Sequence, residues 1–348
     1  MSLLWNLEAH TTSMFRDIQS GVVWTKMDRT KLPQTRTVRQ PDVTVLVPTW
    51  RRIRELRQCL VALDSQEVKP LEVIVVGSRD DVDLAEAARS LMAEHPNTRI
   101  LFSPTLGIVS QLNFGLGQVK TNLVFLTDDD GIPTKTWIAA GVELFGPRDV
   151  AVIGGPTPEI GRVGLVGRNH RFGQVFGFLT YNLLLNSQME GRDKYLRHEG
   201  LRIGGIGGCN MAFDRRRVPG LDPRLRGKCY HFEDDMILSA SRKKLRVVYS
   251  PEVLVYHDTR GRDKQSYRNN PSEDAFNVCL VLIKHIGLTR STFYFLVYIM
   301  SDLLTSLRSR NTSKQAVWKL KANLNGMKEA LATVLKTTTA PSKGRELA

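Results

Sequence analysis

The sequence predicts an α/β fold with a mostly parallel sheet, helices on both faces and a further helical region at the carboxyl end. Strand-length apolar runs and helix-length segments alternate four times up to residue 127, which is typical of right-handed crossovers in a parallel sheet. The run at residues 123–127 has no polar residue before Thr127, as expected of a central strand buried on both faces. Such sheets bind ligands beyond the carboxyl ends of their strands, so we expect the site there.

The elements are expected in a regular order. Strands are predicted at residues 43–47, 71–76, 99–102 and 123–127, with helices at 52–63, 83–93 and 110–119. In the first helix, apolar residues recur at helical spacing at Ile53, Leu56, Leu60 and Leu63. The second half is rich in glycine, which predicts loops or close backbone approach. There we expect a helix at 232–245, strands at 247–249 and 253–256, and a polar loop at 259–274.

The composition of the chain indicates which kinds of partner and which cellular location to expect. The 348-residue chain has a formal net charge of +14, which favours anionic partners such as nucleotides, nucleic acid or an acidic membrane surface. Its four cysteines show no metal-ligand spacing and are too sparse for a disulfide framework, which suits a reducing cytoplasm. The start of the chain lacks a signal-peptide pattern, and no apolar stretch is long enough for a spanning helix. We therefore expect a cytoplasmic protein.

The last part of the chain is basic and amphipathic. Residues 284–348 hold 11 Lys or Arg against 3 Asp or Glu, and apolar residues between 317 and 335 follow helical spacing with lysines on the other faces. Such a helix can lie on an anionic membrane, here as a peripheral contact with the inner face. The alternative is a helical tail packed on its own domain, with the lysines as its solvated face.

Two groups of carboxylates are candidates for chemistry. Asp128, Asp129 and Asp130 follow the central strand, where one or two of them can bind Mg²⁺ or Mn²⁺ together with phosphate oxygens. Glu233 and Asp234 begin the helix predicted at 232–245, where the helix dipole stabilises acidic residues. Taken alone, the first group also fits a solvated turn and the second an ordinary acidic helix start. Their order along the chain is what argues for a site.

In that order and spacing, the chain resembles the inverting glycosyltransferases of family 2, which have the GT-A fold. The resemblance covers about residues 42–258. The matching positions are residues 45–49 with Arg51, residues 72–76, Gly107 with Asn113 and Gly115, residues 128–130 with Pro133 and Trp137, Gly154, Gly155, residues 208–212, Leu221, Asp222, Glu233, Asp234, and residues 246–251 up to His257.

The resemblance implies a metal site. Asp128 and Asp130 match the outer positions of the family's Asp-X-Asp motif, which contact ribose and metal, and Asp129 is the middle residue. His257 matches a position that completes the metal site in some relatives. A single histidine at a strand end is otherwise a hydrogen-bonded structural group. The implied cofactor is a divalent cation, Mg²⁺ or Mn²⁺.

The resemblance also implies contacts with a nucleotide-sugar donor. The expected contacts are Pro48, Thr49, Arg51, Gly77, Arg79, Asp80, Gly107, Asn113, Asp128 and Asp129. Two departures from the family pattern concern the nucleobase. Relatives often have Asp after the second strand, where this chain has Gly77 to Asp80, and many have Arg where it has Leu112. The base therefore stays open among uracil, guanine and thymine, with Arg79 or Asp80 as replacement contacts.

The implied reaction is inverting sugar transfer. Asp234 matches the family's general base and Glu233 its neighbour. The leaving phosphate develops negative charge, which a cation neutralises, while the base takes the proton of an acceptor hydroxyl on the opposite side of the anomeric carbon. Because no second nucleophile is required, the product has inverted configuration. We expect a role in polysaccharide or glycolipid assembly.

Four regions are expected along the chain. They are a polar N-terminal extension at 1–40, a nucleotide-sugar-binding half at 41–155, an acceptor-binding and catalytic half at 156–260, and a basic, mainly helical region at 261–348. Residues 161–200 combine basic side chains with an apolar run, which suits a saccharide or lipid-linked acceptor. The alternative is a core helix beneath a solvated loop.

Three other functions stay open at this point. A nucleotidyltransferase on a related sheet would release pyrophosphate from a nucleoside triphosphate. A basic nucleic-acid-binding protein would fit the net charge, but the chain has no recognition helix, zinc pattern or aromatic-basic motif, so no nucleic-acid partner is expected. A non-catalytic relative could scaffold a membrane complex, although both carboxylate groups are present.

Overall fold

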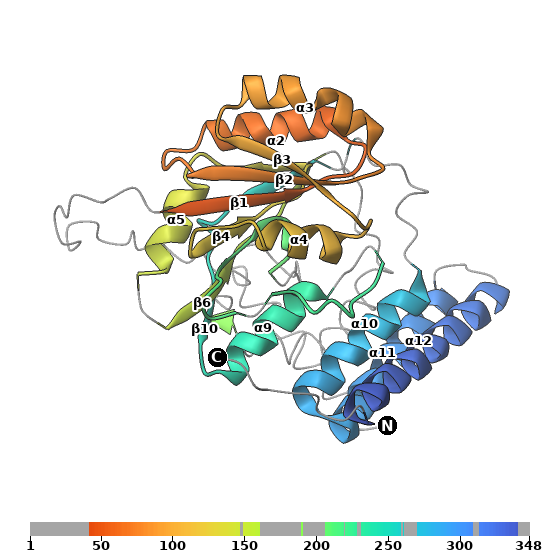
Figure 1. Cartoon of the computed structure of the whole chain (residues 1–348). Helices are drawn as coiled ribbons and strands as arrows, with labels where there is room; N and C mark the ends of the chain where they lie inside the picture. Colours follow the sequence, from red (N-terminus) through yellow and green to blue (C-terminus); the bar gives the residue numbers. More distant parts are fainter. Residues whose placement is uncertain are drawn as a thin grey trace, which may run out of the picture.

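The structure is a computed structural model, and it describes residues 42–146, 149–160, 189–190, 206–218, 220–227, 231–258, 260, 270–308 and 313–339. The expected N-terminal extension and nearly all of the 161–200 segment lie outside the described residues. Figure 1 shows a twisted sheet between helices, with the C-terminal helices beside it.

An eight-stranded sheet forms the centre of the fold (Figure 1). Its order is β3-β2-β1-β4-β9-β6-β10-β8, and β9 runs antiparallel to both of its neighbours while the other pairs are parallel. The strands are β1 (Val43–Pro48), β2 (Glu72–Ser78), β3 (Thr98–Ser103), β4 (Leu123–Leu126), β6 (Val150–Gly154), β8 (Met189–Glu190), β9 (Met211–Asp214) and β10 (Arg246–Tyr249). The prediction of a mostly parallel sheet is confirmed.

Helices cover both faces of this sheet, because alternate strand residues enter two different apolar cores. Val45 of β1 packs in one core with α2, α3 and α5, whereas Leu46 packs in the other with α4, α9 and α10. The helices are α2 (Ile53–Asp64), α3 (Val82–Glu94), α4 (Ile108–Leu116), α5 (Trp137–Leu144), α9 (Phe232–Arg242) and α10 (Pro271–Ile286). The predicted helices are present, although α4 and α9 end before their expected boundaries, with Gly117 and Lys243 as their C-cap residues.

A small second sheet stands beside the first and has the order β5-β11-β7. Its strands are β5 (Gly131–Pro133), β7 (Glu159–Ile160) and β11 (Val255–Asp258). The last strand begins two residues later than predicted, because the carbonyl of Val253 accepts a hydrogen bond from the Asn210 side chain instead of pairing in a sheet. His257 therefore lies within a strand rather than after it.

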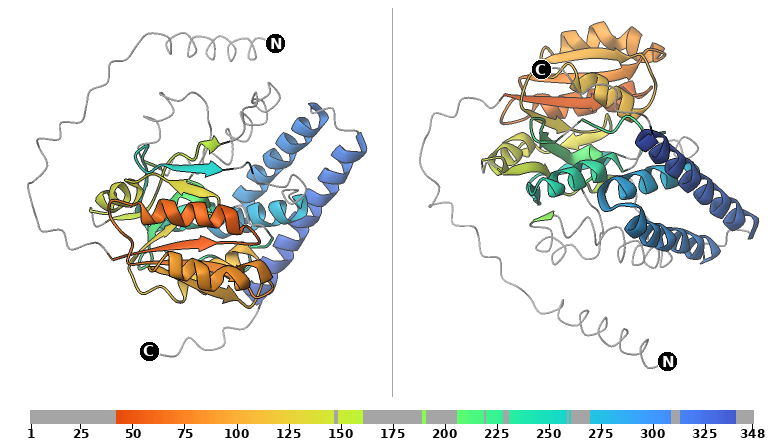
Figure 2. Two further views of the ribbon diagram at one scale, coloured as in Figure 1. Left: turned by 90° about the horizontal axis from the view of Figure 1, so that it is seen from above. Right: turned by 60° about the horizontal axis from the view of Figure 1, so that its bottom comes forward.

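The C-terminal region forms α10, α11 (Leu288–Arg308) and α12 (Ser313–Thr339). The polar loop predicted at 259–274 ends earlier than expected, because α10 begins at Pro271. Asn270 caps this helix by accepting a hydrogen bond from the Ser272 backbone N–H, and Pro271 occupies the first turn. Figure 2 shows α11 and α12 as a helical pair extending from one side of the sheet domain. None of the helices that the structure describes combines the length and the apolarity that crossing a membrane requires.

The apolar face predicted for residues 317–335 is divided in the structure. Leu320, Met327 and Val334 pack against the core that contains α4 and α9. The packing is close, because a Cβ at Gly326 would lie 2.2 Å from the carbonyl oxygen of Ser272. Other apolar residues of the same helix, Val317, Trp318, Leu324 and Leu335, are exposed. The described part of the tail therefore packs on its own domain and still presents an apolar stripe.

Candidate active site

The carboxyl ends of three strands meet at one edge of the main sheet. Pro48 of β1 pairs with Val76 of β2, and Leu46 pairs with Leu126 of β4. The residues that follow each strand therefore emerge side by side, which places Thr49 next to the aspartates after β4. This is the edge at which we predicted the site.

The aspartates after β4 do not form a solvated turn. Asp129 and Asp130 are fully buried, and the guanidinium of Arg52 bridges them, with Nη2 2.7 Å from Oδ1 of Asp129 and Nη1 2.6 Å from Oδ2 of Asp130. Thr49 donates its hydroxyl to Oδ2 of Asp129 at 2.8 Å. Burial raises the pKa of Asp129 to about 7, although Arg52 opposes the shift. Asp129 thus anchors the turn internally, whereas the side chain of Asp128 is 26% exposed.

The small second sheet places His257 beside these aspartates. Its Nε2 atom lies 2.9 Å from Oδ1 of Asp130 and 3.6 Å from Oδ2 of Asp128. Pairing of His257 with Gly131 sets this position, and Gly131 permits the tight turn because a Cβ there would lie 2.2 Å from the Thr127 hydroxyl. Burial lowers the pKa of His257, but the two aspartates outweigh burial and raise it to about 9.

A cation can be held at this edge by three side chains from separate segments. One ligand atom from each of Asp128, Cys209 and His257 can be chosen so that all three atoms lie within 4.8 Å of one another. Carboxylate, thiol and imidazole are all established ligand types for divalent metals. The donor set therefore fits the divalent cation that the sequence predicted.

The turn at residues 208–210 connects this cluster to the second carboxylate group. The backbone N–H of Gly208 donates to Oε1 of Glu233 at 2.8 Å. Asn210 is buried and donates to the carbonyls of Pro156 and Val253, while its Oδ1 accepts from the indole of Trp137 at 2.8 Å. The turn at 208–210 is thus hydrogen-bonded to Glu233 and also carries Cys209, which lies beside Asp128 and His257.

Glu233 and Asp234 lie in the first turn of α9 in different environments. Burial and the neighbouring charge of Asp234 raise the pKa of Glu233 to about 7. Asp234 lies 2.8 Å from Nδ1 of His231, measured to Oδ2. Burial lowers the pKa of His231, but the hydrogen bond to Asp234 outweighs it and raises the pKa above its ordinary value. His231 has a φ of 86°, which is uncommon for a residue other than glycine.

Most of the expected donor contacts also lie at this edge. Arg51, with a φ of 54°, places its guanidinium 4.9 Å from the centre of the Trp50 ring and donates its backbone N–H to Asp81. Arg79 and Asp80 are exposed after β2. Gly107 begins α4 with a φ of 129°. The glycine at position 77 is explained by packing, because a Cβ there would lie 2.2 Å from the side chain of Leu84. Pro48 is buried at the end of β1.

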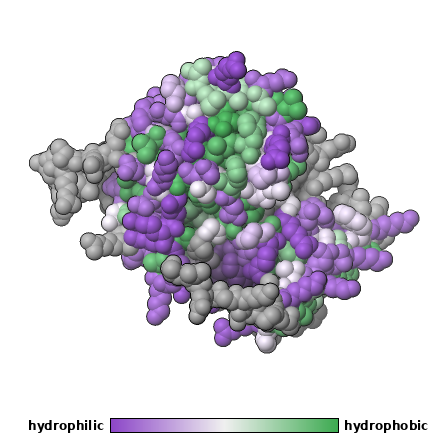
Figure 3. Space-filling view, viewed as in Figure 1, coloured by the Kyte–Doolittle hydropathy of each residue, from purple (hydrophilic) through white to green (hydrophobic). Residues whose placement is uncertain are grey.

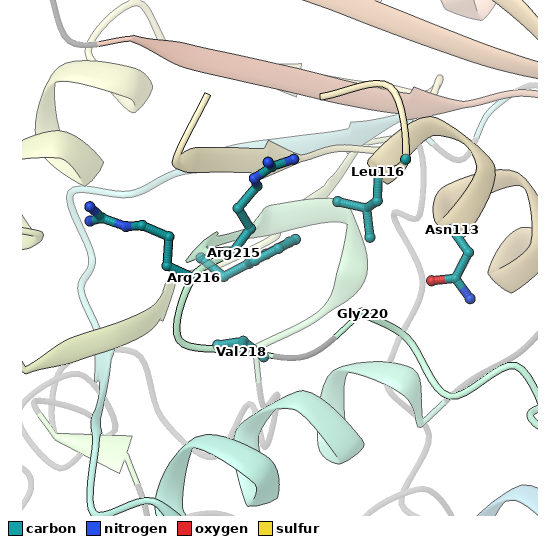
Figure 4. Close-up of a pocket in the computed structure, with 8 residues that line it drawn as sticks. Asn113, Leu116, Arg215, Arg216, Val218 and Gly220 are labelled. Atoms are coloured by element: carbon teal, nitrogen blue, oxygen red, sulfur yellow. The ribbon is translucent and has the colours of Figure 1, made fainter. Parts of the chain in front are cut away.

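Asn113 lies beside a different hollow. Its amide donates to the Leu221 carbonyl and accepts from the Leu221 backbone N–H. The hollow has a volume of ≈ 420 Å³ and is lined by Asn113, Leu116, Gly117, Phe213, Arg215, Arg216, Val218 and Gly220 (Figure 4). Asp214 pairs with Leu123 at the amino end of β4, so this hollow is at the edge of the sheet opposite the aspartates. The donor contact expected of Asn113 stays a prediction.

Four residues of the site were missed by sequence reasoning. Arg52 and Asp81 are polar residues just after strands, and His231 precedes the acidic start of α9, so the first three carried a local signal. Cys209 lies within the matching range 208–212 but carried no metal-ligand signal, because its partners are remote in sequence and the spacing of the cysteines suggested no ligand set. Only the closure of the sheet edge brings its sulfur next to Asp128 and His257.

The fold of this chain is similar to that of several solved glycosyltransferase structures, including the following two. Mannosyltransferase PcManGT from Pyrobaculum calidifontis, in complex with GDP-Man and Mn²⁺, matches with a TM-score of 0.52 at 16% identity, over 87% of this chain and 88% of that chain. TarS from S. aureus matches with a TM-score of 0.53 at 11% identity, over 85% of this chain and 82% of that chain. At these identities the likeness concerns the fold. The sheet and its flanking helices define the GT-A class, as the sequence predicted.

The family follows from the sequence itself. The profile of the family described as Glycosyltransferase like family 2 matches residues 41–271, so the chain belongs to this family and the predicted resemblance is confirmed. Among curated proteins, Glycosyltransferase AglE of Haloferax volcanii is 27% identical over 118 residues. That match spans 33% of this chain and 39% of AglE.

Proposed function

We propose that this protein is a metal-dependent inverting glycosyltransferase that moves a sugar from a nucleoside-diphosphate sugar to a hydroxyl acceptor. The observation that carries the proposal is that one hydrogen-bonded turn, at residues 208–210, contacts Glu233 and also lies beside Asp128. Asp128 and His257 lie at a cation-sized cluster with Cys209, and Gly208 of the same turn binds Glu233, next to Asp234. In this arrangement the diphosphate would leave at the cation, and the acceptor hydroxyl would lose its proton at Asp234.

The donor half uses the residues at the strand ends. A bound divalent cation supplies charge neutralisation for the leaving diphosphate. Asp128 and His257 would hold it. Asp129 and Asp130 are ion-paired with Arg52 and would keep the turn in place, and the ligand role that the resemblance implies for Asp130 stays a prediction. Thr49, Arg51, Arg79, Asp80 and Gly107 line the same edge and would contact the nucleotide and sugar.

The acceptor half depends on Asp234. As general base it would accept the proton of the attacking hydroxyl, and His231 orients its carboxylate from 2.8 Å. Glu233 accepts a hydrogen bond from the Gly208 N–H, and its pKa of about 7 leaves it partly protonated near neutral pH. Its proposed role is to position the turn, next to the base. One displacement with no covalent enzyme intermediate gives inversion at the anomeric carbon.

Replacing Asp234 by Asn tests the proposal. The variant should abolish transfer while donor-induced thermal stabilisation persists, because Asn keeps the shape of the carboxylate but cannot accept the proton. Asp83→Asn, which changes an exposed acidic residue in the first turn of α3, is the matched control. GDP-mannose with Mn²⁺ is the first donor to try, because PcManGT was solved with these ligands.

Two outcomes would contradict the proposal. Turnover retained in Asp234→Asn would remove Asp234 as the base. Release of pyrophosphate from a nucleoside triphosphate, with no nucleotide released from any nucleotide sugar, would favour the nucleotidyltransferase alternative.

We also propose that the acceptor is a saccharide or a lipid-linked saccharide in polysaccharide or glycolipid assembly, and that α11 and α12 contact an anionic membrane surface. The support is the apolar stripe that these basic helices expose. A cytoplasmic location at the inner face is the setting in which this contact would occur.

A further inference from the structure

We propose that the thiol of Cys209 is a direct ligand of the catalytic cation, so that the metal centre is a carboxylate, imidazole and thiolate site rather than one of carboxylate and imidazole alone. This inference rests on the metal site in the proposed function and specifies its chemistry. Its basis is the cluster of Asp128, Cys209 and His257, whose ligand atoms lie within 4.8 Å of one another.

The backbone on each side of Cys209 is held in place. Gly208 donates its N–H to Glu233, and a Cβ at Gly208 would lie 2.4 Å from the ring of Phe232, so the chain passes tightly against α9. Asn210, on the other side, is buried and hydrogen-bonded to Pro156, Val253 and Trp137. A half-buried thiol between two such anchors has little freedom to turn away, as a preorganised ligand requires.

The other two ligands are also fixed by the fold. His257 is paired with Gly131 across the small sheet. The N–H of Gly131 donates to the carbonyl of Asp128 at 2.9 Å, which closes the turn that presents the Asp128 carboxylate. Asp129 and Asp130 are buried and ion-paired with Arg52, so Asp128 is the most exposed carboxylate of the three. Three ligands from three segments leave positions for phosphate oxygens.

This ligand set changes the expected metal preference. Carboxylate, carbonyl and water ligands suit Mg²⁺, whereas thiolate and imidazole favour Zn²⁺ and other later transition metals. We therefore expect Co²⁺ and Zn²⁺ to bind more tightly than Mg²⁺, with Mn²⁺ between them. A thiolate ligand also predicts that bound metal protects Cys209 from alkylation.

Titration of the full-length protein with Co²⁺, without any donor, tests the ligand directly. Wild-type protein should develop a near-ultraviolet sulfur-to-cobalt charge-transfer band, and Cys209→Ser should lose this band and bind Co²⁺ at least about tenfold more weakly. Cys279→Ala, at a buried thiol of α10, and Cys229→Ser should keep the band. Cys209→Asp restores a ligand as oxygen and should shift the preference toward Mg²⁺, so a poorly folded serine variant does not leave the question open.

The outcomes separate this inference from the proposed function. Nucleotide-sugar turnover with no Cys209-dependent band, or an unchanged band in Cys209→Ser, would overturn the thiolate ligand and leave the glycosyltransferase intact. A Cys209-dependent band in a protein that turns over no donor would support the metal centre and count against the reaction.

Discussion

At the scale of single residues, two adjacent carboxylates have different surroundings. Glu233 accepts the Gly208 N–H and is buried enough that its pKa rises to about 7, while Asp234 is paired with His231. The sequence shows both as one acidic helix start. The division proposed for them, into a positioning carboxylate and a base, rests on what each side chain touches.

Replacing Glu233 by Gln should remove a pH dependence from the stability. The pKa of Glu233 rises from 4.5 to about 7 on folding, so the folded protein binds this proton more tightly than the unfolded chain. This stabilisation is complete below the unfolded pKa and is lost as the pH rises through the folded pKa, by on the order of 3 kcal/mol. Gln still accepts the Gly208 hydrogen bond.

Urea denaturation of both proteins across this pH range measures the effect. The stability of wild type minus that of Glu233→Gln should fall with rising pH. A difference that increased with pH would show that folding depresses the pKa of Glu233 instead.

Replacing His231 by Gln should slow transfer more than it weakens donor binding. The imidazole orients the Asp234 carboxylate, and misplacing a reacting group costs about 10²-fold in rate. Steady-state kinetics should show this loss in kcat with little change in the donor KM, together with an altered pH–rate profile.

His95→Gln is the matched control, because Nδ1 of His95 lies 2.5 Å from Oδ2 of Asp64 in a pair involving α2 and the end of α3. An equal loss of kcat in both variants, or a loss confined to KM, would contradict the positioning role of His231.

At the scale of elements, α11 and α12 are where exposed apolar residues gather. Phe293, Leu296 and Met300 of α11 are each more than half exposed, and their spacing places them on one face. Figure 3 shows that hydrophobic and hydrophilic residues are interspersed over this part of the molecule. A face of this kind can insert apolar side chains into an anionic lipid surface while the arginines of α11 and the lysines of α12 contact the headgroups.

Replacing Phe293, Leu296 and Met300 together by Ser should reduce binding to vesicles that contain anionic lipid. Each buried apolar side chain contributes about 1.5 kcal/mol or more, so partitioning should fall at least tenfold in a sedimentation assay. Val61, Leu71 and Val82, equally exposed on the opposite part of the fold, form the control set when changed to Ser. Equal binding by the α11 variant and wild type would exclude this face as the membrane contact.

At the scale of the whole molecule, a partly buried ionic cluster joins the C-terminal helices to the catalytic domain. Lys284 of α10 lies 3.1 Å from Oδ2 of Asp222 and 2.8 Å from Oδ1 of Asp235, and Nε2 of His285 lies 2.7 Å from the same Asp235 oxygen. Burial raises the pKa of Asp222, but Arg224 and Lys284 outweigh it and hold the pKa well below its usual range. Asp235 follows Asp234 in α9, so the helical region contacts the helix that carries the proposed base.

Replacing Lys284 by Met should destabilise the protein by about 2 to 3 kcal/mol, because two buried carboxylates would lose a shared cation. Urea denaturation measures the loss. Glu329→Gln breaks the exposed pair between Arg226 and α12 and should cost less than about 1 kcal/mol. Similar losses of unfolding free energy in both variants would show that burial of the Lys284 cluster adds nothing to its contribution to stability.

Much of the nucleotide-binding half followed from local sequence. The apolar runs, their lengths and the polar residues after them are short-range features, and β1, β2, β4 and α2 lie within a few residues of their predicted ranges. The position of His257 was less predictable, because β11 begins only after Asn210 has bound the carbonyl of Val253. Hydrogen bonds from remote segments decide such boundaries.

The sequence by itself determined the family, the parallel sheet and the two carboxylate groups, because strand patterns and the order of motifs are local features of the chain. Only the tertiary structure decided how these groups combine. It buried Asp129 and Asp130 against Arg52, tied Glu233 to the turn at 208–210 and placed Cys209 beside Asp128 and His257. The physical reason is that these contacts join residues far apart in the chain, which meet when the strand ends converge at one edge of the sheet.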